Sequence, residues 1–177
     1  MKIRCVLVLS IFILLSISCT ERAEPETFLV PKGYQGKINV IFNQSKGQIE
    51  KYENGRRVYE IPAGGILVTR FKDNYGIMNQ QYFYVDSAGH REALKELDVR
   101  DFNEEWTTTK NKNEPSRDEL AIFFAARVGV YGNSDDPKSM RFQEFYVSTY
   151  RELKKYHELK YDQQFLGKVM ELTGFKF

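Results

Sequence analysis

The sequence predicts a mainly β domain of the α+β class: an antiparallel β-sandwich or open barrel of about seven or eight short strands, with one or two C-terminal helices packed on it. Three observations lead to this prediction. Turn-forming residues recur about every 8–12 positions in the first half of the chain, apolar and polar residues alternate between these turns, and a helical period appears only near the C-terminus. Tyr and Phe are also abundant, with 11 and 13 copies, and both suit a pleated, half-buried surface.

The first expected strand shows the alternation. Ile38, Val40 and Phe42 are apolar, and the intervening Lys37 and Asn39 are polar. A period of two indicates a strand with one buried face and one face in water.

A hairpin is expected at Asn54-Gly55, because a type I′ turn needs positive φ at both central residues. It would join a strand around Ile49–Glu53 to one around Arg56–Ile61. Turn residues delimit four further expected strands: Ile66–Phe71, Gln80–Val85, His90–Leu94 and Gln143–Val147.

Leu120–Tyr131 (LAIFFAARVGVY) fits two interpretations. Ser116 and Glu119 have the spacing of a capping box, which would begin a helix. The Phe and Val content and the ending at Gly129 favour a buried central strand, and this is the prediction we prefer.

The C-terminal residues change to a helical period. Thr149 and Glu152 form a capping box for a helix to about Leu159, and Asp162 can cap a second helix that ends at Gly174. This second helix carries an apolar stripe, which must cover an open face or end of the sheet: Phe165, Leu166, Val169, Met170 and Leu172.

The N-terminus has the layout of an export leader. Lys2 and Arg4 precede an apolar run, Cys5–Ile17, which is too short for a spanning helix of about 20 residues. Small residues then precede Cys19, as in the lipobox of a bacterial lipoprotein, although Leu15 stands four residues before the cysteine instead of three. The alternative is ordinary cleavage after Ser18, which would leave a soluble secreted protein with a free thiol.

These features divide the chain into a signal peptide at 1–18, a lipid anchor and tether at 19–27, and one globular domain at 28–177 whose helical part is about 149–173. The eight residues from Thr20 to Thr27 reach at most about 28 Å. We expect the domain in the cell envelope, held to a membrane through Cys19 and facing the periplasm or the cell surface.

Composition excludes several classes of function. The leader removes Lys2 and Arg4, so 24 basic residues face 24 acidic ones in the mature chain, without the basic patch of a nucleic-acid-binding protein. The two cysteines are Cys5 and Cys19, so the mature domain has no internal disulfide and no thiolate metal site.

Catalytic motifs are incomplete. His157-Glu158 begins a zinc-protease motif, but Tyr161 stands where the second histidine would be. We therefore expect no metal, no cofactor and no enzymatic activity. The alternative is an envelope hydrolase whose site forms only in three dimensions, and Asp86, Ser87 and His90 are its candidate cluster.

A ligand-binding surface is expected at Tyr82, Tyr84 and Trp106. Tyr82 and Tyr84 share one face of their strand, and an exposed tyrosine ladder can bind a glycan or a protein partner. The preferred alternative is that the C-terminal helices pack on these tyrosines, because the helix stripe needs a partner.

Four segments have recognisable motifs: Phe28–Tyr34 (FLVPKGY), Tyr59–Phe71 (YEIPAGGILVTRF), Tyr82–Gly89 (YFYVDSAG) and Phe145–Tyr156 (FYVSTYRELKKY). These segments resemble a family of uncharacterised bacterial lipoprotein domains, a domain-of-unknown-function family. The resemblance covers roughly Phe28 to His157 and leaves Tyr161–Phe177 outside. Because the motifs consist of turn and core residues, the resemblance implies a fold and transfers no activity or ligand. The sequence therefore predicts a lipid-anchored envelope protein with a non-catalytic binding or structural domain.

Overall fold

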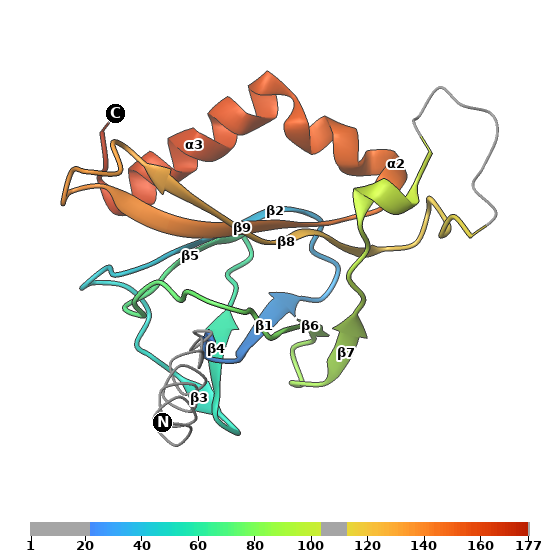
Figure 1. Cartoon of the computed structure of the whole chain (residues 1–177), viewed down its shortest axis with the longest axis horizontal. Helices are drawn as coiled ribbons and strands as arrows, with labels where there is room; N and C mark the ends of the chain where they lie inside the picture. Colours follow the sequence, from blue (N-terminus) through green and yellow to red (C-terminus); the bar gives the residue numbers. More distant parts are fainter. Residues whose placement is uncertain (1–21, 104–112, 177) are drawn as a thin grey trace, which may run out of the picture.

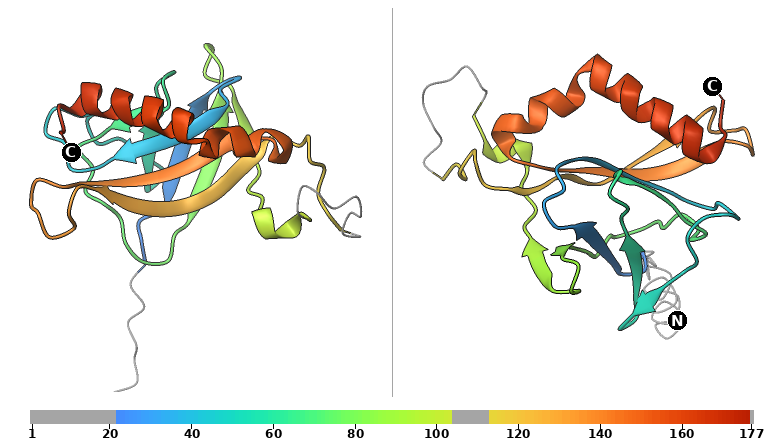
Figure 2. Two further views of the ribbon diagram at one scale, coloured as in Figure 1. Left: turned by 90° about the horizontal axis from the view of Figure 1, so that it is seen from above. Right: turned by 180° about the vertical axis from the view of Figure 1, so that it is seen from behind.

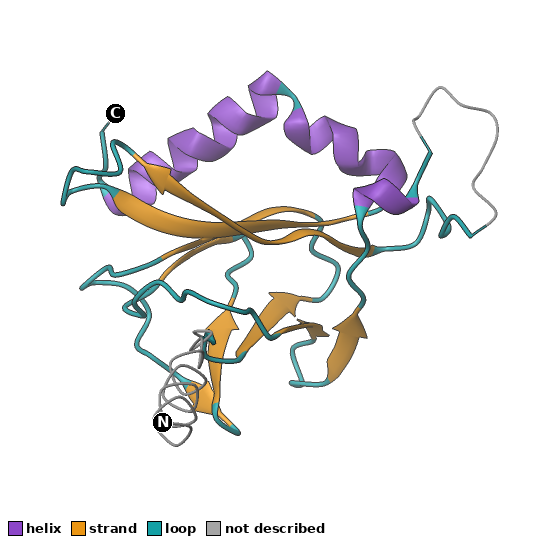
Figure 3. Ribbon diagram, in the orientation of Figure 1, coloured by secondary structure: helices purple, strands orange, loops and turns teal. Residues whose placement is uncertain are grey.

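The computed structural model describes residues 22–103 and 113–176, which form two packed sheets and a helical layer (Figure 1). Within these residues nine strands divide into a five-stranded and a four-stranded sheet. Helices cover the outer face of the four-stranded sheet, and Figure 3 shows them as one layer above the strands. The predicted mainly β sandwich is confirmed.

The five-stranded sheet has the order β3-β4-β1-β6-β7. Its strands are β3 (Tyr52–Glu53), β4 (Arg56–Glu60), β1 (Glu26–Pro31), β6 (Gln80–Val85) and β7 (Arg91–Leu94). The central strand β1 runs parallel to both β4 and β6. The outer pairs β3–β4 and β6–β7 are antiparallel, and the first is the hairpin predicted at Asn54-Gly55, where both residues have positive φ.

The four-stranded sheet has the order β5-β2-β9-β8. Its strands are β5 (Ile66–Val68), β2 (Gly36–Ile41), β9 (Met140–Ser148) and β8 (Ala121–Tyr131). β2 pairs in parallel with β5 and antiparallel with β9, and β9 pairs antiparallel with β8.

Within the described residues, the predicted antiparallel pairing holds for four of the seven strand pairs and is wrong for three, β1–β4, β1–β6 and β2–β5, which are parallel. The chain passes from one sheet to the other after β1, β2, β4, β5 and β7, so neighbouring strands of a sheet are often not consecutive in sequence and can run parallel, as β1 does with β4 and β6 and β2 does with β5. Strands that enter from the same side lie parallel, and antiparallel neighbours arise mainly from tight hairpins. Turn signals fix where the chain reverses but not which sheet it joins.

The helical layer consists of α2 (Tyr150–Leu153), the 3₁₀ turn η2 (Lys154–His157) and α3 (Leu159–Thr173). Figure 2, seen from above, shows this layer crossing the four-stranded sheet from one end to the other. A separate 3₁₀ turn, η1 (Val99–Asp101), lies beyond β7.

The helix ends follow the predicted caps in part. Thr149 Oγ1 accepts a hydrogen bond from Glu152 N at 3.2 Å, and Gly174 ends α3 at φ 71°. Asp162 does not cap α3, because the helix already begins at Leu159 after Glu158. The Asp162 side chain instead pairs with Lys37, as described below.

The core between the sheets is built on an aromatic row. Phe28 in β1 lies between Tyr59 in β4 and Tyr82 in β6, with ring centroids 4.9 and 5.0 Å apart. Phe145 of β9 approaches this row from the opposite sheet, 5.1 Å from Phe28 and edge-on. Such offset and edge-on pairs add stability beyond the area that they bury.

Leu120–Tyr131 forms the preferred strand, as β8, but at the edge of its sheet and not at the centre. A bulge between Phe123 and Arg127 bends this strand, and Phe124 and Ala126 have positive φ there. The apolar run packs on both faces in its first three residues, Ala121–Phe123, which are fully buried.

The structure also shortens the expected tether. Ala23 and Glu26 are buried and β1 already begins at Glu26, so residues 22–27 belong to the folded domain. Their polar composition suggested a linker, but their side chains are bound by residues distant in sequence. Arg57 Nη2, for example, donates a hydrogen bond to Glu24 Oε1 at 2.6 Å.

Candidate functional site

The predicted binding surface at Tyr82 and Tyr84 is not exposed to solvent. Tyr82 and Tyr84 are 2% and 5% exposed and point into the core between the sheets. Packing is thus their role, but their partner is the opposite sheet and not the C-terminal helices. Burial raises the pKa of Tyr84 to about 12, in keeping with its position in the core between the sheets. Trp106 lies outside the described residues.

Asp86, Ser87 and His90 form an exposed turn. Asp86 Oδ1 accepts hydrogen bonds from Ala88 N and His90 N, both at 2.9 Å, and Asp86 Oδ2 lies 3.0 Å from His90 Nδ1. The backbone donor of His90 and then its side chain lower the pKa of Asp86. Among the described residues no hydrogen bond joins Ser87 to either partner, so the structure shows a capped turn there.

Two further predictions concern lipidation at Cys19 and metal binding. Cys19 lies outside the described residues. Over residues 22–103 and 113–176, no three His, Cys, Asp or Glu side chains converge as a metal site would require. None of the described helices is long and apolar enough to cross a membrane.

An open notch lies at one end of the sandwich, where the loop after β5, and not a strand, faces β8 and β9. Its volume is about 190 Å³. Phe42 and Val128 contribute apolar side chains to its wall, and Gln143 lies at its base. Gly129 is needed beside it, because a Cβ there would lie 2.4 Å from Phe142 Cζ.

Gln143 is the polar group that distinguishes this notch. It faces the core side of β9, opposite Val40, and is 1% exposed. Its Nε2 is buried, and no hydrogen-bond partner for it is found in the described part of the chain. A buried amide without a partner costs about 1–3 kcal/mol, so a ligand oxygen that accepts from it would recover that cost.

The rim of the notch is charged and aromatic. Arg141 Nε lies 3.3 Å from Asp73 Oδ2, and its guanidinium lies 5.8 Å from the ring centre of Tyr75. Tyr75 and Val128 are 51% and 58% exposed. The notch therefore combines an apolar wall, one unpaired donor at the base and an ion pair at its mouth.

The outer edge of β8 is open beside the notch. The start of β8 is covered, because Ile122 exchanges backbone hydrogen bonds with Lys95 and Leu97. Beyond the bulge, from Arg127 to Tyr131, no strand of the described residues pairs with this edge. An uncovered edge offers backbone donors and acceptors to another extended chain.

A larger hollow of about 610 Å³ adjoins the notch and shares Phe42, Asp73 and Arg141 with it. The loop between β8 and β9 forms its other side, with Asp135 and Asp136. Asp136 Oδ1 accepts from Lys138 N at 2.8 Å, so this carboxylate closes a turn.

A group of four charged side chains, here called the charged seam, lies where the four-stranded sheet faces α3. Lys37 and Glu144 are largely buried, and Arg127 and Asp162 are partly exposed. Lys37 Nζ lies 3.1 Å from both Glu144 Oε2 and Asp162 Oδ1, and Arg127 Nε lies 3.2 Å from Glu144 Oε1. Burial acts to lower the pKa of Lys37, but the charge of Glu144 raises it above its usual value. The seam joins helix to sheet and leaves no open site.

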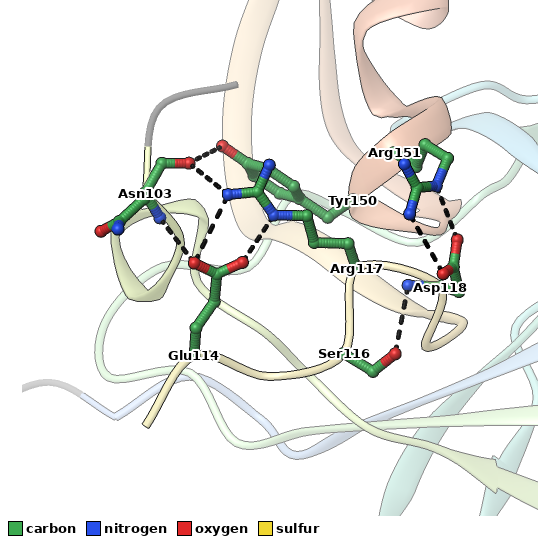
Figure 4. A network of polar contacts seen from close by, with 7 residues as sticks. All are labelled: Asn103, Glu114, Ser116, Arg117, Asp118, Tyr150 and Arg151. Atoms are coloured by element: carbon green, nitrogen blue, oxygen red, sulfur yellow. Dashed lines mark hydrogen bonds and ion pairs between the residues drawn. The ribbon is translucent and has the colours of Figure 1, made fainter. Parts of the chain in front are cut away.

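A second polar cluster joins the two sides of residues 104–112 to α2 (Figure 4). Glu114 accepts hydrogen bonds from Arg117 Nε at 2.6 Å and Asn103 N at 3.2 Å, and its side chain is 1% exposed. Tyr150 OH and Arg117 Nη2 both donate to Asn103 O at 3.3 Å. Because these polar groups form hydrogen bonds with one another, we infer that the cluster has a structural role.

Comparison with protein families identifies the domain. Residues 22–149 match the model of a family of unknown function, DUF6843. The chain belongs to this family. No curated protein matches it. The family is the kind that the resemblance predicted, but the match begins earlier, at residue 22, and ends at residue 149, before the helical segment that the resemblance included.

A solved structure shares the fold. A protein named "Putative Lipoprotein from Bacillus anthracis" aligns with a TM-score of 0.55 and 16% sequence identity, over 88% of this chain and 100% of that one. At this identity the likeness concerns the fold.

The notch lies wholly within the DUF6843 part of the chain, because its lining runs from Phe42 to Gln143. The larger hollow also takes Thr173 and Phe175 from outside that part. Sequence analysis missed the notch. Its one usable signal was Gln143, a polar residue at the start of the last expected strand, whose burial depends on pairing with β2.

Proposed function

We propose that this chain is a lipid-anchored cell-envelope protein, acylated at Cys19, whose DUF6843 domain is a non-catalytic binding module for an extended peptide segment of a protein partner. The leader and the cysteine at its end support the anchor, and the name of the structural neighbour agrees with it. The unpaired amide of Gln143 at the base of an open notch is the observation that favours binding.

A peptide fits the notch better than a large ligand does. The notch, with about 190 Å³, is smaller than the pockets of about 300–1,000 Å³ that hold drug-sized ligands and has room for one side chain, and the adjoining hollow of about 610 Å³ leaves room for the neighbouring residues of an extended segment. The open edge from Arg127 to Tyr131 supplies main-chain pairing for the rest of the segment. Gln143 Nε2 then donates to a peptide carbonyl.

The binding half is tested by nuclear magnetic resonance with ¹³C-methyl-labelled valine and the peptide acetyl-Thr-Leu-Thr-Phe-Thr-amide as the probe. We expect the methyl signals of Val128 and Val130 to shift on titration. In Gln143→Leu the affinity should fall about three- to tenfold, the loss of one neutral hydrogen bond. Leu172→Ser, on the far side of α3, is the matched control and should bind as the parent does. A response to a disaccharide with none to the peptide would contradict this assignment.

The anchoring half is tested in cells grown with labelled palmitate. The full chain should incorporate label, and Cys19→Ser should not. An unmodified thiol at residue 19 in the intact mass of the mature protein would instead support cleavage after Ser18 and secretion.

A further inference from the structure

The exposed apolar side chains of this domain gather around the point where the chain enters it. Seven large hydrophobic residues are exposed in the described ranges. Four of them, here called the entry patch, lie in segments that bind or adjoin residues 22–24: Ile49, Tyr52, Tyr75 and Ile77. Exposed apolar groups that cluster in this way mark an interaction surface.

Specific contacts fix the entry patch to the first described residues. Ile77 pairs with Arg22 in a parallel β-bridge, and Tyr52 OH donates to Glu24 Oε2 at 3.1 Å. Asn74, next to Tyr75, bonds the backbone of Glu24. In Figure 1 β1, the first strand of the described part of the chain, lies beside β4 on the side of the domain away from the helical layer.

The short connection between Cys19 and Arg22 keeps the entry patch close to the membrane. Only three residue steps separate Cys19 from Arg22, and three extended residues reach about 11 Å at most. Lipid chains on Cys19 place that residue at the headgroup level, where Tyr and similar amphipathic side chains are favoured. The entry patch is therefore within reach of the same layer.

We infer that the entry patch docks on the lipid surface, so that the domain is held in one orientation on the bilayer and not swung freely on its anchor. This inference rests on the anchoring part of the proposed function. Residues 22–24, 49–53 and 72–77 contain three cations and four carboxylates, so the attraction is apolar. Docking should accordingly depend little on ionic strength or on anionic lipid.

The orientation also has a consequence for the notch. Tyr75 belongs both to the entry patch and to the rim of the notch. A docked domain therefore presents its notch close to the membrane, toward a partner that lies near the bilayer surface.

The test uses the lipidated full-length protein in phosphatidylcholine vesicles, with a fluorophore on Ile77→Cys or, as the matched control, on Leu172→Cys. These two positions have nearly equal exposure, 59% and 60%, on different sides of the domain. Cys5 leaves with the leader and Cys19 carries lipid, so the introduced thiol is the one that is labelled.

Nitroxide lipids labelled near the headgroup should quench the fluorophore at position 77 several-fold more than at position 172, at low and at high salt. Adding Ile49→Ser and Tyr75→Ser should reduce the quenching at position 77 toward the control value. Equal quenching at both positions, in protein that floats with the vesicles, would overturn docking and leave the anchor intact. Protein that does not float would contradict the anchor and the docking together.

Discussion

The inner face of the four-stranded sheet meets the other sheet through aromatic and aliphatic side chains, whereas its outer face meets the helical layer through apolar clusters and, in addition, through the charged seam. Ile38 and Val40 point inward, while Lys37 and Asn39 point outward from the same strand, and Asn39 is also fully buried. The inner face is stabilised mainly by burial of apolar area, whereas the outer face combines apolar burial with paired charges at the partly exposed seam. Mutations of the core and of the seam should therefore have different effects.

The largest effect is expected at the inner face. Phe145 is fully buried against Phe28 and Tyr82. Phe145→Ala should lower the free energy of unfolding by about 3–5 kcal/mol through lost burial and a cavity. Urea denaturation of the soluble domain measures this change, with the exposed Leu172→Ala as control, which should change stability by less than about 0.5 kcal/mol. A loss below about 1 kcal/mol would show that the aromatic row is not the core that the contacts indicate.

A smaller loss of unfolding free energy is expected for mutations in the charged seam on the outer face. Glu144→Gln should cost about 2–3 kcal/mol, because Lys37 remains buried with Asp162 as its one carboxylate. The Arg127 pair adds little, since its guanidinium is 56% exposed. Denaturation of Lys37→Met combined with Glu144→Leu provides the contrast. This double variant should be more stable than Glu144→Gln, and a result below the single variant would mean that the seam stabilises by more than charge pairing.

A change in the opposite direction is expected at Gln143. Gln143→Leu removes a buried donor that has no partner and should raise stability by about 1 kcal/mol. Thermal unfolding measures the gain, and the peptide titration proposed above measures the accompanying loss of binding. A destabilised variant would indicate that the amide makes a contact essential to the fold.

The smallest effect concerns pH. The ring of His157 packs on Phe124 and Tyr146 beside the seam, and burial there lowers its pKa below the usual 6.5. The unfolded chain thus binds a proton first as the pH falls, so stability should decline below about pH 6.5 and level off below the folded pKa. Denaturation between pH 7.5 and 5 should show a weaker decline in His157→Gln. An identical slope in both proteins would assign the effect to other groups.

The predictable part of the fold depended on local chemistry. Asn54-Gly55 specifies its turn through backbone φ alone, and Thr149 and Gly174 specify helix ends through capping. These signals need no distant partner, so they were correct. Lys37, Asn39 and Tyr82 were assigned to the wrong environment, because alternation distinguishes two faces of a strand but does not reveal what covers each one.

The sequence by itself therefore determined the mainly β composition, the hairpin and the C-terminal helices. The tertiary structure alone decided the parallel pairing of β1, the burial of Tyr82 and Tyr84, and the end notch with its unpaired Gln143. The physical reason is the same in each case: these features arise where segments far apart in the chain meet, and the order in which the chain crosses between two sheets sets those meetings.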